Sequence, residues 1–371
     1  MSNKHRNYSV LMFPWLAHGH AFPFLELAKK LAKRSNFHIC FCSTPSILNS
    51  IKQLDKFSLS IQLIELHLPS LPELPPQYHT TKGLPPHLMP TLKEAFDMAS
   101  PSFFNILKNL SPDLLIYDLI QPWAPALASS LNIPVVYFLV SSAATSAFMF
   151  HAIKKNSLGD ANDDDEEFPS SSIFIHDYYM KPFFSNMSFR ELEGKYIDYL
   201  SDLIKKKVVP VDPLVQDPVE EDDHEKGVME IIQWLDKKER SSTVFVSFGS
   251  EYFLSKEEME DIALGLELSG VNFIWVVRFP CGAKVKVDEE LPESFLERTK
   301  ERAMVIEVME SMRLGVPIIA MPMHVDQPLN ARLVEDVGIG LEVRRNKCGR
   351  IQREEMARVI KEVLTLINGL V

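Results

Sequence analysis

Short apolar runs alternate with amphipathic segments along the whole chain. In the first half, five such runs are short enough and apolar enough to predict buried strands. They are residues 8–15, 37–44, 60–68, 113–118 and 134–140. Helical patterns separate several of them, and strand–helix alternation is typical of a doubly wound parallel sheet. We therefore predict a parallel sheet with the strand order 3-2-1-4-5.

The helical patterns of the first half have one apolar and one polar face. In the segment after the first strand, Phe24, Leu27, Ala28 and Leu31 recur at helical spacing, and lysines and an arginine occupy the other side. Further helices are predicted at residues 91–110, 123–132 and 189–207. The proline-rich segment 69–90 is interpreted as a surface loop.

The second half repeats the alternation. Strands are predicted at residues 243–250, 272–278, 303–308, 317–323 and 340–343, and helices at 228–239, 256–270, 329–337 and 352–368. The run Pro317–Met323 is interpreted as a buried strand, and Asp326 and Gln327 directly follow it. Open α/β sheets place their ligands at the carboxyl ends of strands, so this pair is a candidate ligand site.

The length of 371 residues favours two domains. The acidic stretch VEEDDHEKG at residues 219–227 is a plausible linker, and we predict an N-terminal domain of residues 1–210 and a C-terminal domain of residues 211–371. No G-x-G-x-x-G sequence opens a helix after a strand, so a dinucleotide cofactor is not indicated.

Charge and composition narrow the possible partners and locations. A net charge of −11 argues against nucleic acid or an anionic membrane surface as the main partner. No apolar run has the length of a membrane span, and the first residues have no signal-peptide cleavage site. The four cysteines are too scattered for a disulfide framework, and Cys40 and Cys42 share one strand face as expected of buried thiols. A reducing, cytoplasmic setting fits this pattern.

The acidic run NSLGDANDDDEE at residues 156–167 has two interpretations. A solvated loop is favoured, because no strand flanks the run. The alternative is a carboxylate motif that holds a divalent ion against a diphosphate.

One pair of residues suggests acid–base chemistry. His20 follows the first strand and Asp118 closes the fourth, and these strands are neighbours in the predicted order. A neutral imidazole can take a proton from a hydroxyl, and a carboxylate behind it fixes its tautomer. The alternatives are an exposed loop histidine, the expected state of His18, and a helix cap for Asp118. A serine nucleophile is not indicated, because no G-x-S-x-G sequence exists.

Several longer segments carry a family resemblance. They are FPWLAHGHAFPFLELAKKLAKR, LLIYDLIQPWAPALASSL, SFRELEGKY, TVFVSFGSEYFLSKEEMEDIALGLE, NFIWVVRFP and GVPIIAMPMHVDQPLNARLVE. Together they resemble plant UDP-dependent glycosyltransferases of family 1, and most closely the branch that extends the sugar chains of glycosides such as those of triterpenoids and flavonoids. The resemblance implies the GT-B fold, two Rossmann-like doubly wound domains that face each other. It also implies a metal-independent enzyme with no cofactor, whose co-substrate is a UDP-sugar.

The resemblance assigns roles to individual residues. His20 matches the general base that deprotonates the acceptor hydroxyl, and Asp118 matches the acid paired with it. Ser250 matches the serine at the nucleotide, although a strand-end turn is its alternative interpretation. Glu310 matches the acid that takes the ribose hydroxyls, and a solvated helix residue is equally plausible. Asp326 and Gln327 match the pair that holds the hydroxyls of the transferred sugar, for which an acceptor and a mixed donor and acceptor are suited.

The chain departs from the family pattern in the donor signature. That signature normally starts at W-A-P-Q and continues through H-C-G-W-N-S to the glutamate, whereas this chain passes from AMVIEV directly to MESMRLGVP. We therefore expect a GT-B fold with missing segments. Two functions are possible for such a chain. The first is a monomeric, inverting transferase that moves a sugar, by default glucose, from its UDP derivative to a hydroxyl of a hydrophobic plant glycoside. The alternative is a catalytically impaired relative that only binds acceptor glycosides or a partner.

Overall fold

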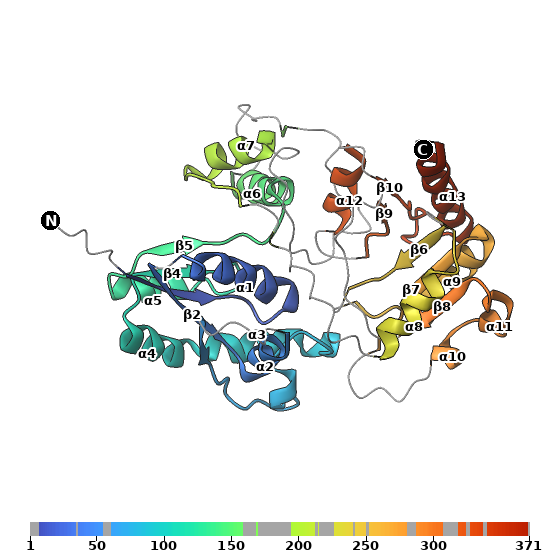
Figure 1. Cartoon of the computed structure of the whole chain (residues 1–371). Coiled ribbons are helices and arrows are strands. Elements are labelled where there is room, and N and C mark those ends of the chain that lie inside the picture. Colours follow the sequence, from blue (N-terminus) through green and yellow to red (C-terminus); the bar gives the residue numbers. More distant parts are fainter. Residues whose placement is uncertain are drawn as a thin grey trace. The chain divides into compact units, whose positions relative to one another are not determined.

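The structure is a computed structural model of the whole chain (Figure 1). It describes residues 7–34, 36–54, 61–158, 168–169, 194–211, 214, 226–239, 242–249, 252–279, 287–306, 318–323, 327–336 and 340–369. The chain forms two compact units, Met1–Val140 with Leu214–Gln216 and Ser141–Pro213 with Asp217–Val371. The domain boundary proposed between residues 210 and 211 stays a prediction.

The described residues of the first unit form one parallel sheet. Its strands are β1 (Tyr8–Phe13), β2 (Phe37–Ser43), β3 (Ile61–Glu65), β4 (Leu114–Tyr117) and β5 (Val135–Tyr137). They lie in the order β3-β2-β1-β4-β5, and every neighbouring pair is parallel. The predicted strand order is thereby confirmed. The switch point of the sheet lies where β1 and β4 meet.

Among the described residues of this unit, five helices accompany the sheet. They are α1 (His18–Ala32), α2 (Pro45–Leu54), α3 (Met89–Met98), α4 (Ser100–Leu110) and α5 (Ala124–Ser130), with short 3₁₀ turns η1 (Pro76–Tyr78) and η2 (Pro86–Leu88). The single helix predicted at residues 91–110 is therefore two helices. Proline lacks a backbone N–H and is tolerated in the first turn of a helix, so Pro101 suits the start of α4. No pattern had predicted α2.

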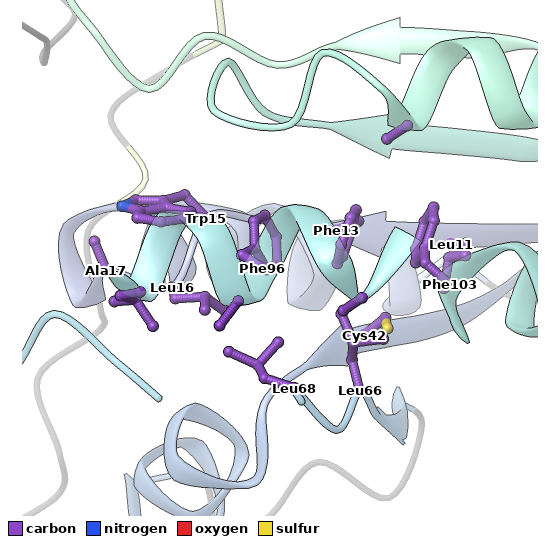
Figure 2. Packing of buried hydrophobic residues seen from close by; sticks show 14 of the residues in the cluster. Leu11, Phe13, Trp15, Leu16, Ala17, Cys42, Leu66, Leu68, Phe96 and Phe103 are labelled. Carbon is purple, nitrogen blue, oxygen red and sulfur yellow. The ribbon is translucent and has the colours of Figure 1, made fainter. Parts of the chain in front are cut away.

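Alternate residues of β1 point to opposite faces of the sheet and join different cores. Leu11 and Phe13 pack with α3, α4 and α5, whereas Val10 and Met12 pack with α1 and α2. Figure 2 shows the first of these cores, where the rings of Phe13 and Phe103 stack with their centroids 3.9 Å apart. Burial on both faces explains why β1 has no polar alternation in its sequence.

Two cysteines on β2 face the first of these cores. Cys40 and Cys42 are buried, and burial raises the pKa of both thiols. Cys348 is exposed. Because a thiolate is the reactive form, we expect iodoacetamide to label Cys348 in the native protein and to reach Cys40 and Cys42 only after denaturation. Peptide mapping by mass spectrometry checks this, and native labelling of Cys42 would contradict the packing of β2.

The second unit holds two parallel sheets among its described residues. One contains β6 (Thr243–Val246), β7 (Asn272–Val276) and β8 (Ala303–Ile306) in that order, and the other contains β9 (Ile318–Ala320) and β10 (Gly340–Glu342). The buried strand predicted at residues 317–323 is therefore wrong in its extent and burial. β9 has three half-buried residues, because among the described strands it pairs only with β10.

Eight helices are described in the second unit. They are α6 (Ala143–Leu158), α7 (Gly194–Ile204), α8 (Lys226–Leu235), α9 (Lys256–Ser269), α10 (Val287–Glu290), α11 (Phe295–Thr299), α12 (Gln327–Asp336) and α13 (Arg353–Gly369). Helices α9 and α13 pack against each other, and Gly265 of α9 makes room for Met356 of α13. A Cβ atom at Gly265 would lie 2.7 Å from the Met356 sulfur. Neither of the acidic stretches at 156–167 and 219–227 is described over most of its length.

Helix α9 begins with a reciprocal cap. The Ser255 hydroxyl accepts a hydrogen bond from the backbone N–H of Glu258, and the Glu258 carboxylate accepts one from the backbone N–H of Ser255. Ser255→Ala removes one of the two bonds, so we expect the free energy of unfolding to fall by about 1 kcal/mol. Urea unfolding measures it, and Ser255→Asp, which keeps a capping oxygen, is the matched control. Equal losses in both variants would contradict the cap.

Candidate active site

His20 lies in the first turn of α1. A loop is the alternative interpretation of its position in the sequence, but the helix already begins at His18. The backbone N–H groups of His20 and Ala21 donate to the Ala17 carbonyl, at 3.1 and 2.8 Å, and this closes the first turn. The imidazole is thus carried on a regular helix at the carboxyl end of β1.

Asp118 directly follows β4, the neighbour of β1 in the sheet. Because Tyr117 at the end of β4 is the register partner of Phe13 at the end of β1, the segments that follow both strands leave the same edge of the sheet. His20 Nδ1 and Asp118 Oδ2 are 2.7 Å apart, and the two residues are 8% and 1% exposed. His20 is therefore not an exposed loop histidine. Asp118 does not cap α5, which starts at Ala124 without a side-chain cap.

The Asp118 carboxylate accepts three hydrogen bonds. Besides the His20 ring, the backbone N–H of Trp15 donates to Oδ2 at 3.0 Å and that of Leu119 donates to Oδ1 at 2.7 Å. An ionised carboxylate can only accept hydrogen bonds. The imidazole must therefore donate to it, so Nδ1 carries the ring proton. Nε2 is then the unprotonated nitrogen and can take a proton from a hydroxyl. The structure brings His20 and Asp118 together, while their catalytic roles stay predictions.

Two side chains near this pair were missed or misjudged from the sequence. Gln121 is fully buried, and its amide Nε2 donates to the Phe13 carbonyl at 2.5 Å, which ties the segment after β4 to the end of β1. The only signal was a polar residue in the apolar stretch LIQPW. His18, expected to be an ordinary exposed histidine, is buried. Its ring packs edge-on against the Phe22 ring, with the two ring centroids 5.1 Å apart. It is buried because it starts the helix whose inner face packs on the sheet.

Among the four predicted donor-site residues, one lies within the described part of the chain. Gln327 is the first residue of α12, and its Oε1 accepts a hydrogen bond from the Met323 backbone N–H at 2.8 Å. This bond holds the side chain at the helix start after β9. Ser250, Glu310 and Asp326 lie outside the described residues.

A cluster of hydroxyl groups fixes α12 to α6. The hydroxyls of Ser142 and Thr145 donate to Asn330 Oδ1 at 3.3 and 3.2 Å. Both are buried, as is Ser146, whose hydroxyl lies 2.6 Å from that of Ser141. The segment that follows β5 therefore begins with a polar, hydrogen-bonded turn of helix.

Two kinds of site are absent from the part of the chain that the structure describes. It has no group of three or more His, Cys, Asp or Glu side chains able to hold a metal ion. None of its helices is both long enough and apolar enough to cross a membrane.

Comparison with known families covers both halves of the chain. Residues 6–216 match the glycosyltransferase N-terminal domain, and residues 219–366 match the family described as UDP-glucoronosyl and UDP-glucosyl transferase. The chain belongs to the plant family 1 UDP-glycosyltransferases. This confirms the resemblance inferred from the sequence motifs.

Characterised relatives align over nearly the whole chain. Mogroside IIIx synthase from Siraitia grosvenorii is 49% identical over 96% of this chain and 86% of its own length. Beta-D-glucosyl crocetin beta-1,6-glucosyltransferase from Gardenia jasminoides is 47% identical over 96% of this chain and 91% of its own length. UDP-glucosyltransferase 29 from Panax ginseng is 48% identical over 100% of this chain and 91% of its own length. The chain is thus a UDP-glycosyltransferase by descent.

Solved structures confirm the fold class. TcCGT1 in complex with UDP has a TM-score of 0.76 at 20% identity, over 98% of this chain and 92% of that one. A UDP-glucosyltransferase from Polygonum tinctorium has a TM-score of 0.74 at 25% identity, over 99% of this chain and 94% of that one. The chain therefore has the GT-B architecture of two parallel α/β domains.

The relatives are longer than this chain within the aligned span. The alignment with mogroside IIIx synthase extends over 414 positions, whereas the chain has 371 residues. At least 43 positions of that alignment therefore have no counterpart here.

Proposed function

We propose that this chain transfers glucose from UDP-glucose to a hydroxyl of a hydrophobic plant glycoside, with His20 as general base. The observation that carries the proposal is the buried His20–Asp118 pair, 2.7 Å apart at the switch point of the first sheet. His20 Nε2 takes the proton of the acceptor hydroxyl as its oxygen attacks the anomeric carbon. The bond from that carbon to the diphosphate breaks, UDP leaves with the electron pair, and the configuration inverts. Asp118 stabilises the imidazolium that forms.

The relatives support a glycoside acceptor and glucose as the sugar. Their names specify mogroside IIIx, glucosyl crocetin, a flavanone 7-O-glucoside and cyanidin-3-O-glucoside, all of them glycosides or products built on glycosides. Those with glucosyltransferase in their names are 47% and 48% identical to this chain, whereas the rhamnosyltransferase and the glucuronosyltransferase are 43% and 42% identical. Glucose is therefore the better-supported donor sugar.

The donor is held, in this proposal, by residues of the second half. Gln327 and Asp326 bind hydroxyls of the transferred sugar, because an amide both donates and accepts while a carboxylate accepts. Glu310 binds the ribose hydroxyls and Ser250 lies at the nucleotide. The reaction so described needs neither a metal nor a further cofactor. We place it in a monomer in the cytoplasm.

The experiment is a transfer assay on the full chain with UDP-glucose. The acceptors are a flavonoid 7-O-glucoside, a triterpenoid glucoside and the two matching aglycones, and both UDP release and glycoside product are measured. We expect UDP release with a glycoside and not with its aglycone. The new linkage should be β, as its anomeric proton coupling shows, because UDP-glucose is an α-glycoside. No product with any glycoside, or an α linkage, would overturn the proposal.

A second candidate is a relative that binds acceptor glycosides without transferring sugar. Two observations favour it: at least 43 aligned positions of mogroside IIIx synthase have no counterpart here, and the described strands of the second unit form two separate sheets. The same assay distinguishes the two, since this candidate predicts glycoside binding in calorimetry without release of UDP.

A further inference from the structure

Two side chains connect the segments that follow β1 and β4. The ladder between these strands ends with the register pair Phe13 and Tyr117. Beyond that pair, the backbone N–H of Trp15 donates to Asp118 Oδ2 at 3.0 Å. In the opposite direction, Gln121 Nε2 donates to the Phe13 carbonyl at 2.5 Å. The two side chains therefore extend the connection between β1 and β4 past the end of the backbone ladder.

The Phe13 carbonyl is a well-fixed anchor for this connection. Phe13 is fully buried, and its ring stacks on that of Phe103 (Figure 2). Its ring centroid also lies 5.7 Å from that of Trp123, two residues after Gln121. Trp123 is held in turn by a hydrogen bond from its Nε1 to Asp97 Oδ1 of α3, at 2.8 Å. The segment after β4 is thus attached to Phe13 by a ring contact and by the Gln121 amide.

The Gln121 amide is used through its donor. Gln121 is fully buried, and none of the described residues hydrogen-bonds to its Oε1. A buried acceptor without a partner lowers stability, and an apolar side chain of the same length would avoid that loss. A polar residue that is locally unfavourable in this way is expected where it serves a functional site. The bond from Nε2 to the Phe13 carbonyl is therefore the useful contact of this side chain.

The geometry of the His20–Asp118 pair depends on the two segments that Gln121 connects. Asp118 Oδ2 accepts both from the Trp15 N–H and from His20 Nδ1, at 3.0 and 2.7 Å. His20 is carried by the segment after β1, since its backbone N–H donates to the Ala17 carbonyl. A shift of one segment relative to the other would therefore move the two ends of the His20–Asp118 bond apart.

We propose that Gln121 is a positioning residue for the proton transfer, and that it acts by keeping Asp118 in line with the His20 ring. With the segments fixed, the Asp118 carboxylate keeps the ring proton on His20 Nδ1, and Nε2 stays unprotonated toward the acceptor hydroxyl. Without the Gln121 amide, the ring can also adopt the other tautomer, in which Nε2 carries the proton and cannot take a second one. The catalytic part of this inference rests on the proposed function, whereas the effect on the tautomer does not depend on turnover.

The first test determines the His20 tautomer and needs no substrate. Long-range ¹H–¹⁵N correlation spectra of the full chain, labelled with ¹⁵N-histidine, distinguish protonated from unprotonated ring nitrogens, and His20→Ala identifies the signals of His20. At a pH where the ring is neutral, we expect the Nδ1–H tautomer alone in the wild-type chain. We expect a mixture with the Nε2–H tautomer in Gln121→Met, which keeps the length of the side chain but has no donor.

The second test measures transfer by the same variant. Gln121→Met should lower kcat by about 10–100-fold, less than the loss of the base itself, and should leave KM for both substrates within about twofold. The matched control is Gln62→Met. Gln62 is exposed on β3, and its Oε1 also lies near a histidine ring, 3.1 Å from His38 Nε2. This control should change neither the His20 tautomer nor kcat.

A double variant separates positioning from a general effect on the fold. In the Asp118→Asn background, which lacks the carboxylate, adding Gln121→Met should lower kcat by less than about threefold, because residues that act through one another are not additive. Thermal melts confirm that the variants fold, and Gln121→Leu is the second variant without a donor.

Three results would overturn the proposal. They are an unchanged His20 tautomer in the folded variants without a donor, a higher KM with unchanged kcat, and an equal loss of kcat with and without the Asp118 carboxylate. A wild-type chain with the Nδ1–H tautomer but no transfer would instead contradict the proposed function. The comparison of tautomers would still decide whether Gln121 positions the pair.

Discussion

Replacing His20 by alanine is expected to lower kcat/KM for glycoside glucosylation by a factor of about 10²–10⁴, the usual contribution of a positioned general base. The variant removes the only described imidazole that is hydrogen-bonded to Asp118 and leaves a methyl group at the helix start. The acceptor hydroxyl then has to lose its proton to water. Steady-state kinetics with saturating UDP-glucose measure the effect, which should fall mainly on kcat.

The matched control is His67→Ala. His67 is in the same unit, its side chain is 73% exposed, and it also lies near a carboxylate, with Nε2 3.3 Å from Glu65 Oε2. Its removal should leave kcat/KM within twofold of the wild-type value. A comparable loss in both variants, or full activity in His20→Ala, would show that the buried imidazole is not the base.

Asp118→Ala is expected to reduce both stability and activity. The substitution removes the acceptor of two backbone N–H groups, that of the buried Trp15 and that of the half-buried Leu119. Each unsatisfied group costs about 1–3 kcal/mol, so we expect the free energy of unfolding to fall by about 2–6 kcal/mol. Asp118→Asn keeps an acceptor oxygen and should lose less stability, yet its activity should still fall by about 10²–10⁴, because an amide cannot stabilise the imidazolium. Urea unfolding and steady-state kinetics give the two quantities.

Asp113→Ala separates the two roles of a carboxylate at this strand pair. Asp113 precedes β4, and its Oδ2 accepts from the Ser9 backbone N–H at 2.9 Å, at the opposite end of β1 from the site. It should lower stability without lowering the kcat of the folded fraction. If Asp113→Ala and Asp118→Asn reduced kcat equally, Asp118 would be a structural residue alone.

In the first half, hydrophobic periodicity is enough to predict the strands and their order in the sheet. The runs that became β1 to β5 were apolar, short and separated, so their order and direction followed from the rules of parallel sheets. The predicted order places His20 and Asp118 at one edge of the sheet. The burial of His18 and the hydrogen bond of Gln121 were not predictable, because they depend on where α1 starts and on a single carbonyl, that of Phe13.

The second half was predicted less well for a different reason. The apolar run ending at Met323 predicts a buried strand, but burial of a strand depends on neighbours on both edges and faces. A sequence pattern gives only the strand's own side chains. β9 pairs with β10 alone among the described strands and is only half-buried. The break between α3 and α4 at Ala99 likewise depends on one residue, Pro101, and hydrophobic periodicity does not reveal it.

The central claim is that this chain is a working UDP-sugar transferase, and titration of the native full chain with UDP tests it most directly. Isothermal titration calorimetry should show saturable binding of one UDP per chain, and Gln327→Ala should leave it unchanged, because Gln327 is proposed to hold the sugar rather than the nucleotide. UDP-glucose should bind more weakly to that variant than to the wild-type chain. Absence of heat at millimolar UDP, in protein that melts cooperatively, would contradict the claim and leave only acceptor binding.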